Sequence, residues 1–170
     1  MRSDLTSHIR HFIYGKRKTL KDLQCNRDQF LQWFNFQFKE SMTCDEWEVD
    51  HVIPLSMFDL KVPTQHSMAC HWSNLRPVTP EENKAKSDKI KCSDIYHHMS
   101  IINSFLRTHG NYQTSVETCW WLRLQLKHGE NVQDDEELKT LLKWIIRSEP
   151  PKPSTGMEIV QRLNNSGSKN

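Results

Sequence analysis

Residues 47–60 have the sequence WEVDHVIPLSMFDL, and residues 71–90 have the sequence HWSNLRPVTPEENKAKSDKI. Short apolar runs beside prolines predict two short strands, at 47–53 and 75–78, with a long irregular stretch between them. Thr79 follows as a helix N-cap, with a proline at the first helical position and a glutamate that completes a capping box. The two stretches therefore predict the order strand, loop, strand, helix, with the helix running to about the end of the second stretch.

Four polar residues in these stretches carry the chemistry that we infer. Asp50 and His51 are adjacent near the end of the first strand. Asn74 lies 23 residues beyond His51, and Asn83 follows 9 residues later, in the first turns of the helix. A neutral imidazole can take a proton from an attacking water, and a hard divalent cation with oxygen ligands can stabilise a phosphoryl group and its leaving oxygen. His51 could supply the base, and Asp50 with Asn83 could hold the cation, if the strand bends or ends between them.

The two stretches resemble the HNH endonuclease family, in the compact form found in phages and large DNA viruses. The preceding segment LKDLQCNRDQFLQWFNFQFKESMT, residues 20–43, resembles the lead-in of the same proteins, and the likeness extends over about residues 18–91. The resemblance implies a ββα-metal finger, in which two short strands, a loop and a helix form a site for one divalent cation. Beyond Ser93 no resemblance is found.

Carried over to this sequence, the family's pattern implies that Asp50 binds the metal ion and that His51 is the general base. Asn83 would complete the metal site, and Asn74 would brace the loop and orient the base. The implied cofactor is one divalent metal ion, Mg²⁺ by preference, for which Mn²⁺ or Ni²⁺ could substitute. The chain departs from the pattern at Arg76, where an uncharged amide side chain is expected, and in a shorter connection between the lead-in and the first strand.

Basic residues near these positions are candidate contacts to the phosphates of a nucleic acid. The first 24 residues include six basic and two acidic side chains, and three lysines follow closely after Asn83. Such charges can equally form a solvated loop or a solvated helix face. The candidate nucleic-acid-binding residues are Arg76, Lys84, Lys86 and Lys89 around the predicted helix, and Lys16, Arg17 and Lys18 in a basic arm.

The composition limits the class of protein. The chain has 170 residues with 23 Lys or Arg and 21 Asp or Glu, and its net charge of +2 excludes a histone-like polycation. Nothing resembles a signal peptide, and no apolar run is long enough to cross a membrane. The five cysteines include no C-x-x-C pair, which indicates reduced thiols in an intracellular protein and gives no sign of a structural zinc site.

Helical periodicity accounts for most of the remaining chain. Apolar stripes predict helices over 3–14, from Asn26 to about residue 40, and around 95–106 and 138–146. The segment 116–126 fits either a strand or a buried helix. The predicted fold class is therefore α+β and mostly helical, with the HNH finger flanked by N-terminal and C-terminal helices.

We divide the chain into four parts. The expected parts are an N-terminal helical lead-in with the basic arm (1–46), the HNH nuclease core (47–91), a C-terminal helical extension (92–149) and a flexible tail (150–170).

The function that we expect is hydrolysis of phosphodiester bonds in DNA by a metal-dependent endonuclease. Duplex DNA is favoured over RNA as the partner and no membrane is expected, while self-association has no support in the sequence. Three alternatives stay open at this stage. The finger could act on RNA, it could be a DNA-binding module without turnover, or the C-terminal helices could serve a separate interaction.

Overall fold

The computed structural model describes residues 9, 11–15, 21–39, 42, 47–109, 120–121, 123–124 and 132–148. Several expectations concern segments that lie wholly or partly outside these residues: the helix at 3–14, the basic arm Lys16, Arg17 and Lys18, the segment 116–126, and the tail at 150–170.

The two predicted strands form an antiparallel pair. Strand β1 spans Glu48–His51 and β2 spans Leu75–Val78, and the register places Asp50 opposite Arg76. Opposite charges that face each other across two strands attract, which favours this register over its neighbours. Strand β1 includes both Asp50 and His51 and ends at His51.

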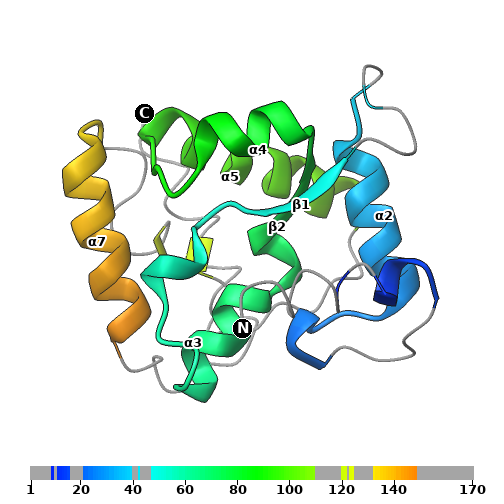
Figure 1. Cartoon of the computed structure of the whole chain (residues 1–170), viewed down its shortest axis with the longest axis horizontal. Helices are drawn as coiled ribbons and strands as arrows, with labels where there is room; N and C mark the ends of the chain where they lie inside the picture. Colours follow the sequence, from blue (N-terminus) through cyan, green and yellow to red (C-terminus); the bar gives the residue numbers. More distant parts are fainter. Residues whose placement is uncertain are drawn as a thin grey trace.

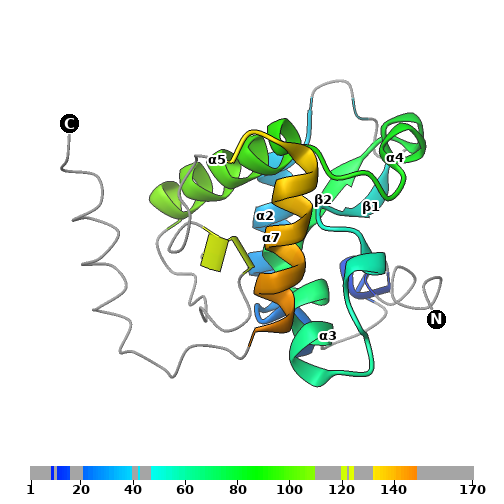
Figure 2. The ribbon, with the colours of Figure 1, turned by 90° about the vertical axis from the view of Figure 1, so that its left-hand side faces the viewer.

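Helices surround this small sheet (Figure 1). The α-helices are α2 (Arg27–Gln37), α3 (Pro63–Cys70), α4 (Pro80–Lys86), α5 (Cys92–Thr108) and α7 (Asp135–Arg147), and the short 3-10 turns are Lys21–Leu23, Leu55–Met57 and Trp72–Asn74. Helix α4 packs along β1, and α2 contacts both β2 and α5. Figure 1 and the turned view in Figure 2 show that the C-terminal end of α7 lies beside α3.

Two helix starts follow directly from the sequence. The Thr79 side chain accepts from the backbone N–H of Glu82 while the Glu82 carboxylate accepts from that of Thr79, so the predicted capping box is confirmed. Asn26 and Gln29 form a second capping box at α2. Helix α4 is shorter than predicted and ends at Lys86, because Ser87 adopts the left-handed φ of 51° that stops the helix.

The prediction of an irregular stretch between the strands was wrong over part of its length. Residues 63–70 form α3, which begins at Pro63 in the first helical position. Its buried residues Met68, Ala69 and Cys70 are consecutive and lie at its C-terminal end, so the helix has almost no amphipathic periodicity. A helix that packs through its end instead of through one face gives no periodic signal in the sequence.

An aromatic core holds the helices and the sheet together. Trp33 of α2 contacts the rings of Trp72 and Phe105, each with ring centroids 5.0 Å apart, and its indole N–H donates to the carbonyl of Leu75 at 2.8 Å. All of these residues are fully buried. The buried aromatic residues of α2, Phe30, Trp33 and Phe34, therefore belong to the hydrophobic core. Trp33 also holds the start of β2 against α2.

The observed architecture confirms the coarse prediction of a mostly helical α+β fold with a small antiparallel sheet. None of the described helices is both long and apolar enough to cross a bilayer. The division of the chain into four parts remains a prediction.

Buried histidines predict that the fold loses stability in acid. Burial lowers the pKa of both His71 and His98 to about 3 from the ordinary value of 6.5. A histidine whose pKa falls on folding favours the folded state above the unfolded pKa, and this contribution is lost as the pH falls toward the folded value. We expect each of these two histidines to lower the free energy of unfolding by about 2 kcal/mol as the pH falls from 7 to 5.

Urea unfolding at pH 7, 6 and 5 measures this loss. The variant His98→Gln, whose amide can still donate to the carbonyl of Ser73, should lose less stability over the same range than the unmodified chain. An equal loss in both proteins would assign the acid sensitivity to other groups.

Candidate functional site

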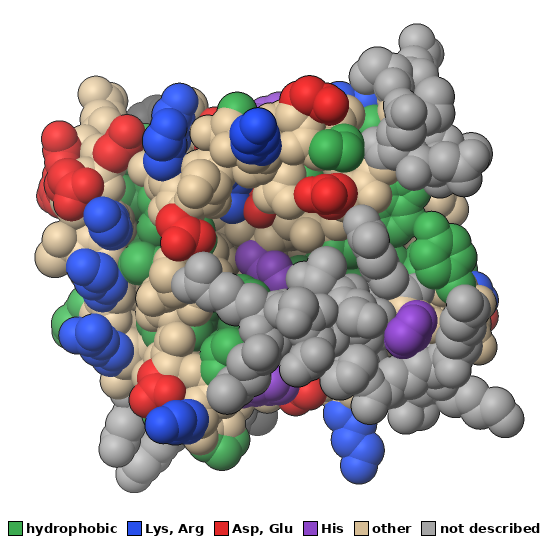
Figure 3. All heavy atoms as spheres, in the orientation of Figure 1, with side chains coloured by type: hydrophobic (Ala, Val, Ile, Leu, Met, Phe, Trp, Pro, Cys, Tyr) green, Lys and Arg blue, Asp and Glu red, His purple; other side chains and the backbone are tan. Residues whose placement is uncertain are grey.

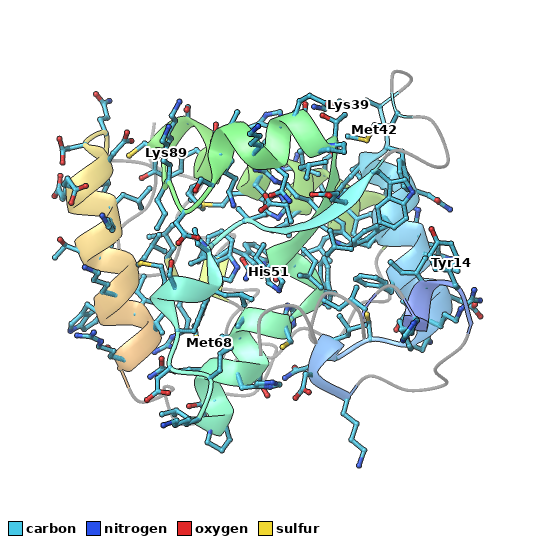
Figure 4. The ribbon with its side chains drawn as sticks, viewed as in Figure 1. Tyr14, Lys39, Met42, His51, Met68 and Lys89 are labelled. Atoms are coloured by element: carbon cyan, nitrogen blue, oxygen red, sulfur yellow. The ribbon has the colours of Figure 1, made fainter. Side chains whose placement is uncertain are left out.

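A pocket of about 370 Å³ opens between the end of β1 and α4. The side chains of Asp50, His51, Asn83 and Lys86 line it. Figure 4 places the labelled His51 near the middle of the molecule, below β1, and Figure 3, drawn from the same side, shows a histidine side chain in a hollow there. Three of the four residues predicted for catalysis and metal binding, Asp50, His51 and Asn83, therefore line one pocket.

Asp50 is a buried carboxylate with a cation on each oxygen. Its side chain is 6% exposed, its Oδ2 accepts from Nε of Arg76 at 2.9 Å, and its Oδ1 accepts from Nζ of Lys86 at 2.7 Å. A charge buried this far requires such partners, because an unpaired buried carboxylate is costly. Arg76 is the residue that departs from the HNH pattern, and its place opposite Asp50 in the sheet explains the contact.

His51 lines the pocket and has one buried ring nitrogen. Its Nε2 is buried and has no hydrogen-bond partner among the described residues. Burial lowers the pKa of His51 to about 4, with the charge of Asp50 opposing and that of Lys86 assisting the shift. The imidazole is therefore neutral at pH 7, the form in which a ring nitrogen can accept a proton.

Asn83 is oriented by a residue that the sequence analysis did not identify. Its Nδ2 donates to Oε2 of Glu48 at 2.6 Å across the face of the sheet. This hydrogen bond fixes the amide so that its oxygen is the atom left to bind a cation. Glu48 gave no signal in the sequence, because its role depends on α4 packing back against β1.

Asn74 is fully buried behind the pocket and not in it. Its Oδ1 accepts from the N–H of Ile53 at 2.8 Å, and its Nδ2 donates to the carbonyls of Ile53 at 3.2 Å and Ala69 at 3.0 Å. Its own carbonyl accepts from the N–H of Val52 at 2.9 Å. These bonds connect the chain just after His51 to the end of α3, and so hold the backbone that carries the imidazole.

A basic groove of about 410 Å³ lies next to the pocket. Arg76, Lys86 and Lys89 line it, as does Lys91, and Lys86 lines both the groove and the pocket. The groove also contains Lys39, which pairs with Glu82 at 2.5 Å, the imidazole of His97 and the carboxylate of Asp94. Three of its basic groups, Lys39, Lys91 and His97, were missed in the sequence because they come from separate elements, and only folding gathers them.

The remaining predicted contacts are less well placed. Lys84 is exposed on α4 and lines neither the pocket nor the groove. Lys16, Arg17 and Lys18 lie outside the described residues.

The residues of the pocket fit a hard divalent cation with few protein ligands. Among the described residues no three His, Cys, Asp or Glu side chains gather into a group that could hold a metal ion. The oxygen donors that line the pocket are instead the carboxylates of Asp50 and Asp88 and the amide of Asn83, and His51 adds a buried ring nitrogen that has no partner among the described residues. Mg²⁺ accepts such a set, since it takes oxygen ligands and keeps several of its waters.

Comparisons with known proteins find relatives in a giant virus. The chain is 39% identical over 109 residues to uncharacterized protein L246 of Acanthamoeba polyphaga mimivirus. The match covers 58% of this chain and 48% of that protein. It is 35% identical over 109 residues to uncharacterized protein L426 of the same virus, with 62% and 48% covered. The chain thus matches about half the length of these relatives. No family model and no solved structure matches it.

The hydrogen bonds of Asn74 predict a large loss of stability when they are removed. Asn74→Ala leaves the buried N–H of Ile53 and the carbonyls of Ile53 and Ala69 without their partners, and we expect unfolding to become easier by about 3 kcal/mol. Chemical denaturation measures the change. The matched variant Asn35→Ala, on the exposed face of α2, should change stability by less than about 0.5 kcal/mol. Equal effects of the two substitutions would contradict the bracing role of Asn74.

Proposed function

We propose that the chain is a metal-dependent endonuclease of the HNH type that hydrolyses phosphodiester bonds in DNA. The observation that carries this proposal is His51, whose buried Nε2 has no partner among the described residues, in a pocket that Asp50 and Asn83 also line. A buried polar atom without a partner is costly and is retained where it has a use. The order β1, loop, β2, α4 supports the proposal, because it is the order that a ββα-metal finger has.

In this mechanism His51 acts as the general base. With its proton on Nδ1, the neutral ring offers the lone pair of Nε2 to a water, which loses a proton as it attacks phosphorus. The adjacent carboxylate of Asp50 stabilises the imidazolium that forms, since its charge raises the pKa of His51. Asn74 positions the ring indirectly, through its hydrogen bonds to the backbone of Val52 and Ile53.

Asp50 and the amide oxygen of Asn83 would hold the divalent cation, Mg²⁺ by preference. When bound, such an ion supplies positive charge that stabilises the phosphoryl oxygens and the leaving oxygen. Glu48 keeps Asn83 in the orientation that this requires.

The basic groove supports a polyanionic substrate. Arg76, Lys86, Lys89 and Lys91 line one groove that meets the candidate catalytic pocket at Lys86. Phosphates bound there would hold a nucleic-acid strand beside His51 without reading its bases. The chain matches only about half the length of its viral relatives. The proposal therefore concerns this pocket, and what a longer protein containing it would do is also proposed.

A second candidate function is a DNA-binding module without turnover. The ion pairs of Asp50 favour it, because Arg76 and Lys86 occupy both carboxylate oxygens. The two functions differ in whether Mg²⁺ or Mn²⁺ produces cleavage of supercoiled DNA.

Replacement of His51 should slow cleavage without weakening the binding of DNA. We expect His51→Ala to slow single-turnover cleavage by a factor on the order of 10²–10⁴, with nearly unchanged affinity for DNA, because a neutral ring adds little to the field of the groove. Excess metal should partly restore Asp50→Ala and should not restore His51→Ala. Cleavage of supercoiled plasmid over a Mn²⁺ titration measures both, and His11→Ala, an exposed histidine elsewhere, is the control.

Cleavage by a correctly folded His51→Ala at the rate of the control would show that another group activates the water. Absence of cleavage by the unmodified chain at every metal concentration, with DNA binding retained, would favour the binding module.

The nature of the substrate is tested by the same assay on duplex DNA, single-stranded DNA and RNA of one sequence. We expect duplex DNA to be cleaved fastest. The chemistry at phosphorus is the same in all three substrates. Faster cleavage of RNA would therefore change the proposed substrate from DNA to RNA and leave the proposed roles of His51 and Asp50 unchanged.

A further inference from the structure

The two cations on Asp50 are held in different ways. Arg76 faces Asp50 directly across the sheet, so the register of β1 and β2 keeps it there. Lys86 reaches Asp50 from the last turn of α4 on a flexible four-carbon stem, and its ammonium also donates to the carbonyl of His51 at 2.6 Å. Of the two, Lys86 is the partner whose ammonium can move without a change in the pairing of β1 and β2.

Lys86 stands at the junction of two compartments. It lines the pocket that contains Asp50, His51 and Asn83, and it also lines the basic groove with Arg76. Its side chain is only 9% exposed in its place against Asp50. Rotation of its stem would carry the ammonium from the carboxylate toward the groove, where a phosphate can replace Asp50 as its anionic partner.

We propose that Lys86 is an exchangeable counter-ion: it pairs with Oδ1 of Asp50 while no divalent cation is there, and transfers its ammonium to a substrate phosphate in the basic groove when a cation takes that oxygen. This inference rests on the proposed function, since it concerns the oxygen that would bind the metal ion.

The burial of Asp50 and its two ion pairs support this exchange. Asp50 is too buried to remain unpaired, and Lys86 satisfies it in the absence of a metal ion. The ammonium and the cation then compete for the same oxygen, which weakens metal binding by the protein alone. A phosphate that receives Lys86 removes the competitor, so metal and nucleic acid strengthen each other's binding by the same factor.

The first experiment measures Mn²⁺ binding by electron paramagnetic resonance, with no nucleic acid present. We expect Lys86→Met, which keeps most of the apolar stem, to bind Mn²⁺ at least tenfold more tightly than the unmodified chain. Lys86→Gln should behave in the same way. Lys143→Met, the same substitution at an exposed position on α7, should leave the affinity unchanged. Adding Asp50→Asn to Lys86→Met should remove the gain.

The outcomes separate the exchange from the proposed function. Equal Mn²⁺ affinity with and without Lys86, reduced in both cases by Asp50→Asn, would overturn the exchange and keep the metal site. If Asp50→Asn left the Mn²⁺ affinity unchanged both in the unmodified chain and in Lys86→Met, Asp50 would not be a metal ligand. That result would overturn the proposed metal site and the exchange together.

The second experiment measures binding of a defined DNA duplex by fluorescence anisotropy, in EDTA and in Ca²⁺. In EDTA, where Lys86 is engaged with Asp50, Lys86→Met should lose less affinity for DNA than it loses in Ca²⁺. In Ca²⁺ it should bind more weakly, and its slope of log K against log salt should be shallower by about 0.9, the value for one phosphate contact. A loss of equal size in EDTA and in Ca²⁺ would show a permanent phosphate contact and overturn the exchange.

Discussion

The buried carboxylate of Asp50 is the constraint on which the pocket depends. A carboxylate this inaccessible needs positive charge beside it, and the fold provides that charge from two directions: Arg76 across the sheet and Lys86 from α4. Removing either partner would leave the charge undercompensated. The pairing of β1 with β2 and the packing of α4 on β1 are therefore coupled to one side chain, and the same side chain is the candidate metal ligand.

The surrounding structure keeps this arrangement in register. Trp33 in the core binds the carbonyl of Leu75 at the start of β2, and Asn74 binds the backbone just beyond β1. Both contacts are buried, so they fix the two strands relative to α2 and α3. An imidazole, a carboxylate and an amide thus line one pocket, and backbone contacts outside it hold the strands that carry two of them.

Local sequence signals predicted the framework, and contacts between distant segments completed it. The capping box at Thr79 and the apolar runs around Asp50 gave the strands and α4, because these features depend on residues a few positions apart. Helix α3 was missed because it packs through its end, without a periodic face. The orienting role of Glu48 and the ion pair between Lys86 and Asp50 join residues about 35 positions apart, and such pairs leave no local pattern.

Asp50 and Asn83 are proposed to hold a divalent cation beside His51. An anomalous difference map from crystals of the protein grown with Mn²⁺ tests it most directly. We expect an anomalous peak in the pocket, in contact with an oxygen of Asp50 and with the amide oxygen of Asn83, and we expect the ammonium of Lys86 to be displaced from Asp50. A map with no peak in the pocket at saturating Mn²⁺, and with Lys86 still paired to Asp50, would contradict it.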